Sequence, residues 1–200
     1  MESKHISPTT QATTIRLNPS TDGKPVEVEV PAGESRFLIF QTGDASVEQT
    51  YRLHLREPDS QAVILGLIEA AGESVPRLRT EAVHHAPRTR AETLIRTLSS
   101  DHANPHYEGL IYMGKAAQGS ESYLNHHTLL LNDTARSWTL PSLEILANEV
   151  KCSHAATMRS ITDLDLFYLR SRGLSREEAH TLLIEAFLAD VLICKSIDES

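Results

Sequence analysis

The clearest pattern near the start of the chain is the strict alternation of valine and glutamate. Val26, Val28 and Val30 are separated by Glu27 and Glu29. Successive side chains of a β-strand point to opposite faces, so this order places valines on one face and carboxylates on the other. The segment is therefore predicted to be a half-buried strand.

Short apolar runs separated by turn residues continue this pattern along most of the chain. They predict strands at 37–40, 51–55, 62–68, 91–98, 110–113, 128–131, 143–146 and about 150–157. Almost no helical period occurs before residue 160, which indicates an all-β body. A sandwich, a barrel and a solenoid all fit the pattern. Aromatic residues make up only 5% of the chain, and stacked aliphatic ladders suit a solenoid, although the absence of a fixed-length repeat counts against a strictly regular one.

After Thr157 the hydrophobic period becomes helical. Thr162 with Asp165 resembles a capping pair, and Gly173 is a natural stop, which predicts a short helix over 164–172. Ser175 with Glu178 forms a capping box for a second helix. Its apolar positions recur at three and four, at Ala179, Leu182, Leu183, Ala186, Phe187 and Val191. The two helices form an αα-hairpin whose apolar faces must be covered by the β body or by a partner.

The pattern divides the chain into three parts. Residues 1–20 mix Ser, Thr, Gln and Pro with little periodicity and are predicted to form a flexible arm. Residues 21–160 form the β core, and residues 161–200 form the C-terminal helical region.

Composition excludes several classes of function. A net charge of −8 without a cluster of Lys and Arg argues against a nucleic-acid partner. No window approaches the roughly 18 consecutive apolar residues of a membrane span, and no leader pattern is visible, so we expect a cytoplasmic protein with no membrane partner. The two cysteines, Cys152 and Cys194, have no CxxC partner and encode neither a disulfide framework nor a closed zinc site.

Cys152 and His154 are the strongest candidates for chemistry. Residues i and i+2 of a strand share a face, so a thiol and an imidazole lie side by side at the junction between strand and helices. Two ligands leave at least two positions of a tetrahedral iron open, and a partner chain or a second copy would have to complete the site. The alternative is a buried small thiol and a hydrogen-bonded surface histidine.

Other candidates are weaker. The adjacent pairs His84-His85 and His126-His127 point to opposite faces of a strand and cannot chelate one ion together. No phosphate-binding glycine loop occurs, and no third residue orients a Cys-His nucleophile. We therefore expect that the chain is not an enzyme.

Several stretches occur in an order that resembles a known family. They are His85-Ala86-Pro87-Arg88-Thr89, Tyr107-Glu108-Gly109-Leu110-Ile111, Ala116-Ala117-Gln118, Tyr123-Leu124-Asn125, Leu129-Leu130-Leu131-Asn132-Asp133, Pro141-Ser142-Leu143-Glu144-Ile145, Val150-Lys151-Cys152-Ser153-His154 and Phe167-Tyr168-Leu169-Arg170-Ser171-Arg172-Gly173. Together they resemble the SufB/SufD family of iron-sulfur cluster assembly proteins, most closely over residues 84–191. The resemblance implies a right-handed β-helix, or solenoid, with a C-terminal α-helical hairpin that docks the ATPase SufC.

The resemblance also implies residue roles. His154 matches a SufD histidine beside the cluster-forming interface, and Cys152 matches the cysteine of the same motif. A gapless alignment puts His126 where SufB has an essential cysteine, and Ala155 where SufB has a glutamate, so the chain looks SufD-like. Little in the sequence corresponds to the N-terminal helical domain of typical members, so we expect a shortened member of the family. The predicted ATPase-docking residues are Phe167, Leu169, Arg170, Gly173 and Leu174.

Two hypotheses follow. In the first, the chain is a SufD-like scaffold that pairs with a SufB-like subunit or with itself through the strands at about 140–157. It would dock a SufC-type ATPase and present His154, Cys152 and His126 at the interface. No cofactor would be tightly bound there, only a transient iron-sulfur cluster with His154 and Cys152 as ligands. In the second, the chain is a non-catalytic homodimeric interaction or regulatory module without cluster chemistry.

Overall fold

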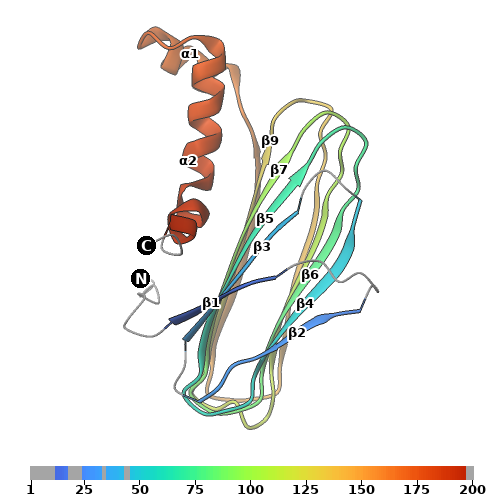
Figure 1. Cartoon of the computed structure of the whole chain (residues 1–200), viewed down its shortest axis with the longest axis vertical. Helices are drawn as coiled ribbons and strands as arrows, with labels where there is room; N and C mark the ends of the chain where they lie inside the picture. The colour runs from blue at the N-terminus through green and yellow to red at the C-terminus, as the bar shows by residue number, and fades with distance from the viewer. Residues whose placement is uncertain (1–11, 18–23, 33–34, 43–45, 197–200) are drawn as a thin grey trace.

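The strands alternate between two parallel sheets, so that the chain winds as a solenoid. The computed structural model describes residues 12–17, 24–32, 35–42 and 46–196. Sheet A has the order β1 (Ala12–Arg16), β3 (Ser35–Thr42), β5 (Gln61–Ala70), β7 (Arg90–Ser99), β9 (Glu121–Leu130) and β11 (Lys151–Ser160). Sheet B has the order β2 (Val26–Glu29), β4 (Glu48–Leu55), β6 (Arg77–His84), β8 (His106–Met113) and β10 (Trp138–Ile145). The predicted solenoid is confirmed, and the structure shows that it has about four turns (Figure 1).

The turns of the solenoid differ in length. Contacting residues one turn apart are separated by 25 positions at Glu27 and Arg52, by 29 at Asp59 and Arg88, and by 31 at Arg90 and Glu121. The strands remain in register while the corners absorb the difference. This is why the sequence shows no fixed-length repeat.

The core consists of side chains that stack in register from one turn to the next. On sheet B, one inward ladder contains Val28, Leu53, Ala82, Ile111 and Leu143. Its central members are buried. Parallel pairing places each of these side chains over the equivalent position of the previous turn, which excludes water from the interior.

Two strands are additional to those predicted. β6 was not expected from the sequence, although its inward positions alternate regularly with outward Arg77, Arg79 and Glu81. β1 lies within the region predicted as an arm and pairs in parallel with β3. Leu17, which follows β1, is buried, and residues 1–11 and 18–20 of that region lie outside the described part of the chain.

The helical hairpin begins and ends where the capping residues indicate. α1 (Asp163–Ser171) has the predicted capping box between Thr162 and Asp165, and Gly173 follows the helix with a φ of 100°. α2 (Arg176–Ser196) starts with reciprocal bonds between Ser175 and Glu178. α1 lies beyond one end of the strands, and α2 runs back beside sheet A (Figure 1).

The apolar face of α2 is covered only in part. Ala179, Leu188 and Val191 are buried, but Leu182, which belongs to the predicted apolar face, is 42% exposed. The exposed position lies toward the α1 end of α2, which projects from the solenoid. None of the helices within the described ranges is both long and apolar enough to cross a membrane.

Gly109 of sheet B lies directly against the side chain of Leu124 of sheet A. It lies on the inward face of β8, and a Cβ atom there would collide with Leu124 Cδ1 and come within 2.9 Å of Tyr107 Oη. Leu124 and Tyr107 therefore use the volume that any larger residue would need.

We expect Gly109→Ala to lower the free energy of unfolding by about 1–3 kcal/mol, because the core is already filled. Urea denaturation of the variant and the wild type would measure this. The double variant with Leu124→Val, which removes the colliding atom, should lose less than the sum of the two single variants. Additive losses would show that the two residues do not compete for space.

Candidate functional site

The solenoid ends in a layer whose inward side chains have no turn above them. β10 and β11 are each the last strand of their sheet, and each pairs on one side only within the described chain. Ile145 and Met158 are 42% and 45% exposed, whereas Met113, in register with Ile145 one turn earlier, is fully buried. We call this surface, formed by β10 and β11, the open end.

Cys152 and His154 both lie on the open end. Cys152 pairs in register with Ser122 and His154 with Leu124. Both partners belong to β9 and face the interior of the solenoid. Cys152 is half-buried and packs against the main core, whereas His154 is exposed. The backbone thus places the thiol and the imidazole on one row, at the mouth of the interior.

The Cys152 thiol is protonated in this surrounding. Burial raises its pKa, and a backbone hydrogen bond with Ser122 opposes that effect only in part. A metal binds the thiolate, so any ligation by Cys152 requires that the metal displace this proton.

His126 lies deeper in the solenoid than His154. It is in register with Ala156 of β11 and has no exposed surface. Its Nδ1 and Nε2 atoms each lie 2.8 Å from a threonine hydroxyl, of Thr139 and Thr97 respectively, and its ring lies tilted against Tyr107, with the two ring centres 4.5 Å apart. Burial lowers the pKa of His126 to about 3, so the ring is neutral.

The adjacent histidine pairs separate as expected. His84 and His126 face the interior, while His85 and His127 face outward. Lys151 also faces outward, away from the interior, and its Nζ donates to Glu121 at 2.7 Å. These positions leave Cys152 and His154 as the two polar candidates at the mouth.

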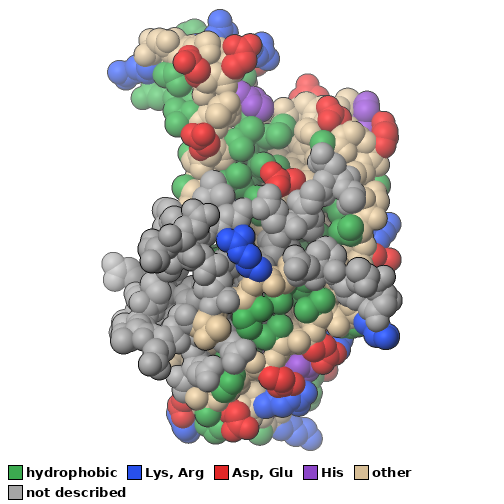
Figure 2. Space-filling view, in the orientation of Figure 1, with side chains coloured by type: hydrophobic (Ala, Val, Ile, Leu, Met, Phe, Trp, Pro, Cys, Tyr) green, Lys and Arg blue, Asp and Glu red, His purple; other side chains and the backbone are tan. Residues whose placement is uncertain are grey.

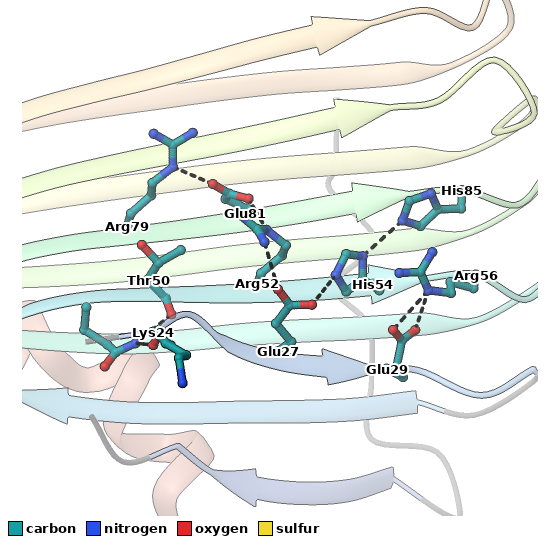
Figure 3. Close-up of polar contacts among 11 residues, drawn as sticks. Lys24, Glu27, Glu29, Thr50, Arg52, His54, Arg56, Arg79, Glu81 and His85 are labelled. Atoms are coloured by element: carbon teal, nitrogen blue, oxygen red, sulfur yellow. Dashed lines mark hydrogen bonds and ion pairs between the residues drawn. The ribbon is translucent and has the colours of Figure 1, made fainter. Parts of the chain in front are cut away.

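A charged ladder on the outer face of sheet B was not found from the sequence. Arg52 donates to Glu27 at 2.8 Å and to Glu81 at 2.5 Å, and Arg79 donates to Glu81 of its own strand (Figure 3). Arg79 also donates to Glu108, which lies one turn further along the solenoid. The arginines lower the pKa of Glu81 despite its burial. Alternating charges at outward positions of β2, β4, β6 and β8 are the signal that could have revealed it.

Two histidines extend this network. His54 Nε2 lies 3.1 Å from Glu27, and His54 Nδ1 lies 3.0 Å from His85 Nε2, with the rings stacked (Figure 3).

The described residues contain no group of three or more His, Cys, Asp or Glu side chains that could hold a metal ion. Cys152 and His154 alone would fill two coordination positions of a metal ion.

The predicted docking residues lie on the projecting hairpin, where Figure 2 shows hydrophobic side chains at the surface. Phe167 is 68% exposed, Arg170 is exposed, and Leu169 and Leu174 are half-buried. Leu164 and Tyr168 add two more exposed apolar side chains to the same helix, and sequence reasoning had not singled them out. Gly173 sits in the turn that joins the helices.

Comparison with known proteins identifies the fold family. A family model described as the SufBD core domain of SUF system FeS cluster assembly matches residues 26–187. The chain belongs to the SufBD family. It is 32% identical over 152 residues to the iron-sulfur cluster assembly protein SufD of Escherichia coli. The aligned residues cover 76% of this chain and 36% of that protein.

Further SufBD relatives show a similar extent of likeness. A SufBD family protein of Synechocystis is 29% identical over 161 residues, or 80% of this chain and 36% of the relative. The SufB protein of Bacillus subtilis is 31% identical over 106 residues, or 53% of this chain and 23% of the relative. The chain thus spans about a third or less of the length of these curated relatives.

Acid should destabilise the protein through His126. Its folded-state pKa of about 3 lies below the ordinary value of 6.5, so the unfolded chain takes up a proton first as the pH falls. The stabilisation is complete above pH 6.5 and is lost progressively below it. We expect His126→Gln to reduce the loss of unfolding free energy between pH 7 and pH 5 by about 2 kcal/mol.

Urea denaturation at several pH values would measure this difference. His102→Gln, which changes an exposed loop histidine, is the matched control. Parallel pH profiles for His126→Gln and the wild type would contradict the assignment of a neutral, buried His126.

Proposed function

We propose that the chain acts in SUF iron-sulfur cluster assembly as a SufD-like, non-catalytic scaffold subunit. The observation that carries this proposal is the open end, where His154 and Cys152 lie on one row beside exposed aliphatic side chains. Such a surface offers two ligands of a soft metal and a place for a second chain to supply the others.

The assignment to the SufD type has two supports. The match to SufD of E. coli extends over more of this chain than the match to SufB of B. subtilis. In addition, the neutral His126 is bonded to two threonines in the interior, at the position where the resemblance would place a sulfur-carrying cysteine. The chain would then assist cluster assembly while a partner carries the sulfur.

We propose that the open end pairs with a SufB-like subunit or, in isolation, with a second copy. Terminal strands of a solenoid present unpaired backbone groups, and burial of Ile145 and Met158 would remove apolar surface from water. The cluster would form transiently between the two chains.

We propose that the helical hairpin docks a SufC-type ATPase. Leu164, Phe167 and Tyr168 are spaced at three and four along α1 and are all exposed, which is typical of a helix face that a partner covers. ATP hydrolysis would belong to that partner, since the chain has no phosphate-binding loop.

The second candidate is a homodimeric interaction module without cluster chemistry. The protonated Cys152 and the absence of a three-ligand group in the described residues favour it. The two candidates differ in whether iron and sulfide bind once the partner proteins are present.

Anaerobic cluster reconstitution with the partner proteins tests the site. We expect His154→Ala to lower cluster yield at least about tenfold, because one ligand of an incomplete site is lost. Iron and sulfide content and the visible absorption of the cluster would be measured, with His102→Ala as the control. An unchanged yield would remove His154 from the site, and ATPase binding without any iron or sulfide would favour the interaction module.

Light scattering at micromolar concentration tests the pairing of the open end. We expect a homodimer. Met158→Glu should raise the dissociation constant of this dimer at least about tenfold, because a carboxylate would be buried in the interface without a partner. Leu164→Glu makes the same change in charge on the hairpin and should leave the dimer intact. A monomeric wild type would contradict pairing in isolation.

A further inference from the structure

α2 rests on sheet A through a small apolar contact. Leu188 packs against Leu67, Leu98 and Leu129 of β5, β7 and β9, with Ile184 and Phe187 beside it. The rest of the hairpin projects past the body (Figure 1). Aliphatic contact is not directional, so this patch alone does not fix the rotation or the angle of the helix.

One charged side chain lies within this contact. Arg96, on the outward face of β7, is 7% exposed. Its Nη2 donates to the Asp190 carboxylate, its Nη1 donates to the Ile95 carbonyl at 3.1 Å, and its guanidinium lies 5.7 Å from the centre of the Phe187 ring. A buried guanidinium is costly unless it is paired, so its geometry selects the position of the pairing group.

Arg96 therefore holds two side chains of α2 that are three residues apart. Phe187 and Asp190 lie on one helix face, one turn from each other. Contact with both sets the rotation of α2 about its axis and its position along the sheet, which the aliphatic residues leave open.

α2 has room to move on the β11 side of this contact. A cleft of about 420 Å³ separates the helix from the sheet, with Arg96, His127, Thr157 and Arg159 on one side and Phe187 and Asp190 on the other. His127 and Thr157 bond to each other on its floor. Without the contacts of Arg96, tilting of α2 into this space would redirect the whole hairpin.

We propose that Arg96 and Asp190, braced by Phe187, are the positioning residues that set the angle at which the hairpin leaves the solenoid. They would thereby orient the exposed face of α1, formed by Leu164, Phe167 and Tyr168, toward its partner. The orienting role stands on the geometry of α2, while its consequence for docking rests on the proposed function.

Spin-label distances test the orientation directly. Labels at Ser171→Cys on α1 and Lys115→Cys on the solenoid would be placed in a chain that carries Cys152→Ser and Cys194→Ser. The double variant Arg96→Met with Asp190→Leu, called the unpaired variant, replaces the ion pair with apolar side chains. We expect one narrow distance distribution with the native pair and a broad one with the unpaired variant. A distribution that stays narrow in the unpaired variant would overturn the proposal.

The reversed pair, Arg96→Glu with Asp190→Arg, restores the ion pair but not the contacts of Arg96 with Phe187 and the Ile95 carbonyl, so it should narrow the distribution only in part. It also tests the proposal if the unpaired variant fails to fold, because a distribution as broad as that of Arg96→Glu alone would contradict the proposal. A role in packing alone predicts instead that thermal stability changes while the distribution in the folded state does not.

Affinity for the SufC-type ATPase of the same organism gives the second readout. If the unpaired variant populates the competent angle a tenth of the time, its dissociation constant for the ATPase rises about tenfold, and the reversed pair lowers it again in part. Phe167→Ala should weaken binding without broadening the distances. If the wild type does not bind the ATPase, the docking proposal fails, and the distance measurement still decides the orienting role.

Discussion

Each turn of the solenoid is completed by the next one. Parallel backbone hydrogen bonds hold every inward side chain over its equivalent one turn earlier, and burial of one layer depends on the layer above. The core is therefore a series of nearest-neighbour contacts, as in other repeat folds. The same constraint creates the open end, because β10 and β11 keep inward-facing side chains that no described strand covers.

The polar groups of the molecule follow the same stacking. Arg52 and Arg79 alternate with glutamates on the outer face of sheet B. Arg52 of β4 ties Glu27 of β2 to Glu81 of β6, and Arg79 of β6 extends the ladder to Glu108 of β8. Inside, His126 and His84 take inward positions in which burial keeps both rings neutral. Register therefore determines whether a polar residue is a surface ion pair or a buried hydrogen-bonded group.

Sequence patterns were most informative where hydrophobic contrast was strong. β5 and β7 are rich in aliphatic residues and were predicted nearly to their ends, and both capping boxes fixed the helix starts. β6 was missed because its inward positions Thr80, Ala82 and His84 are weakly apolar, although the period of two is present. The shared row of Cys152 and His154 followed from strand geometry, whereas their place at an uncovered end depends on contacts between residues about 30 positions apart.

The unequal turns have a consequence for how such a chain can change. Residues at the corners take no part in the register between strands, whereas those in the strands do. A turn of 25 positions and one of 31 therefore support equivalent ladders of stacked side chains. Insertions or deletions of several residues at a corner can therefore accumulate without shifting any strand against its neighbour. In this architecture the length of the chain can change at the corners while the stacked core stays intact. The corners are therefore the places to insert new surface loops.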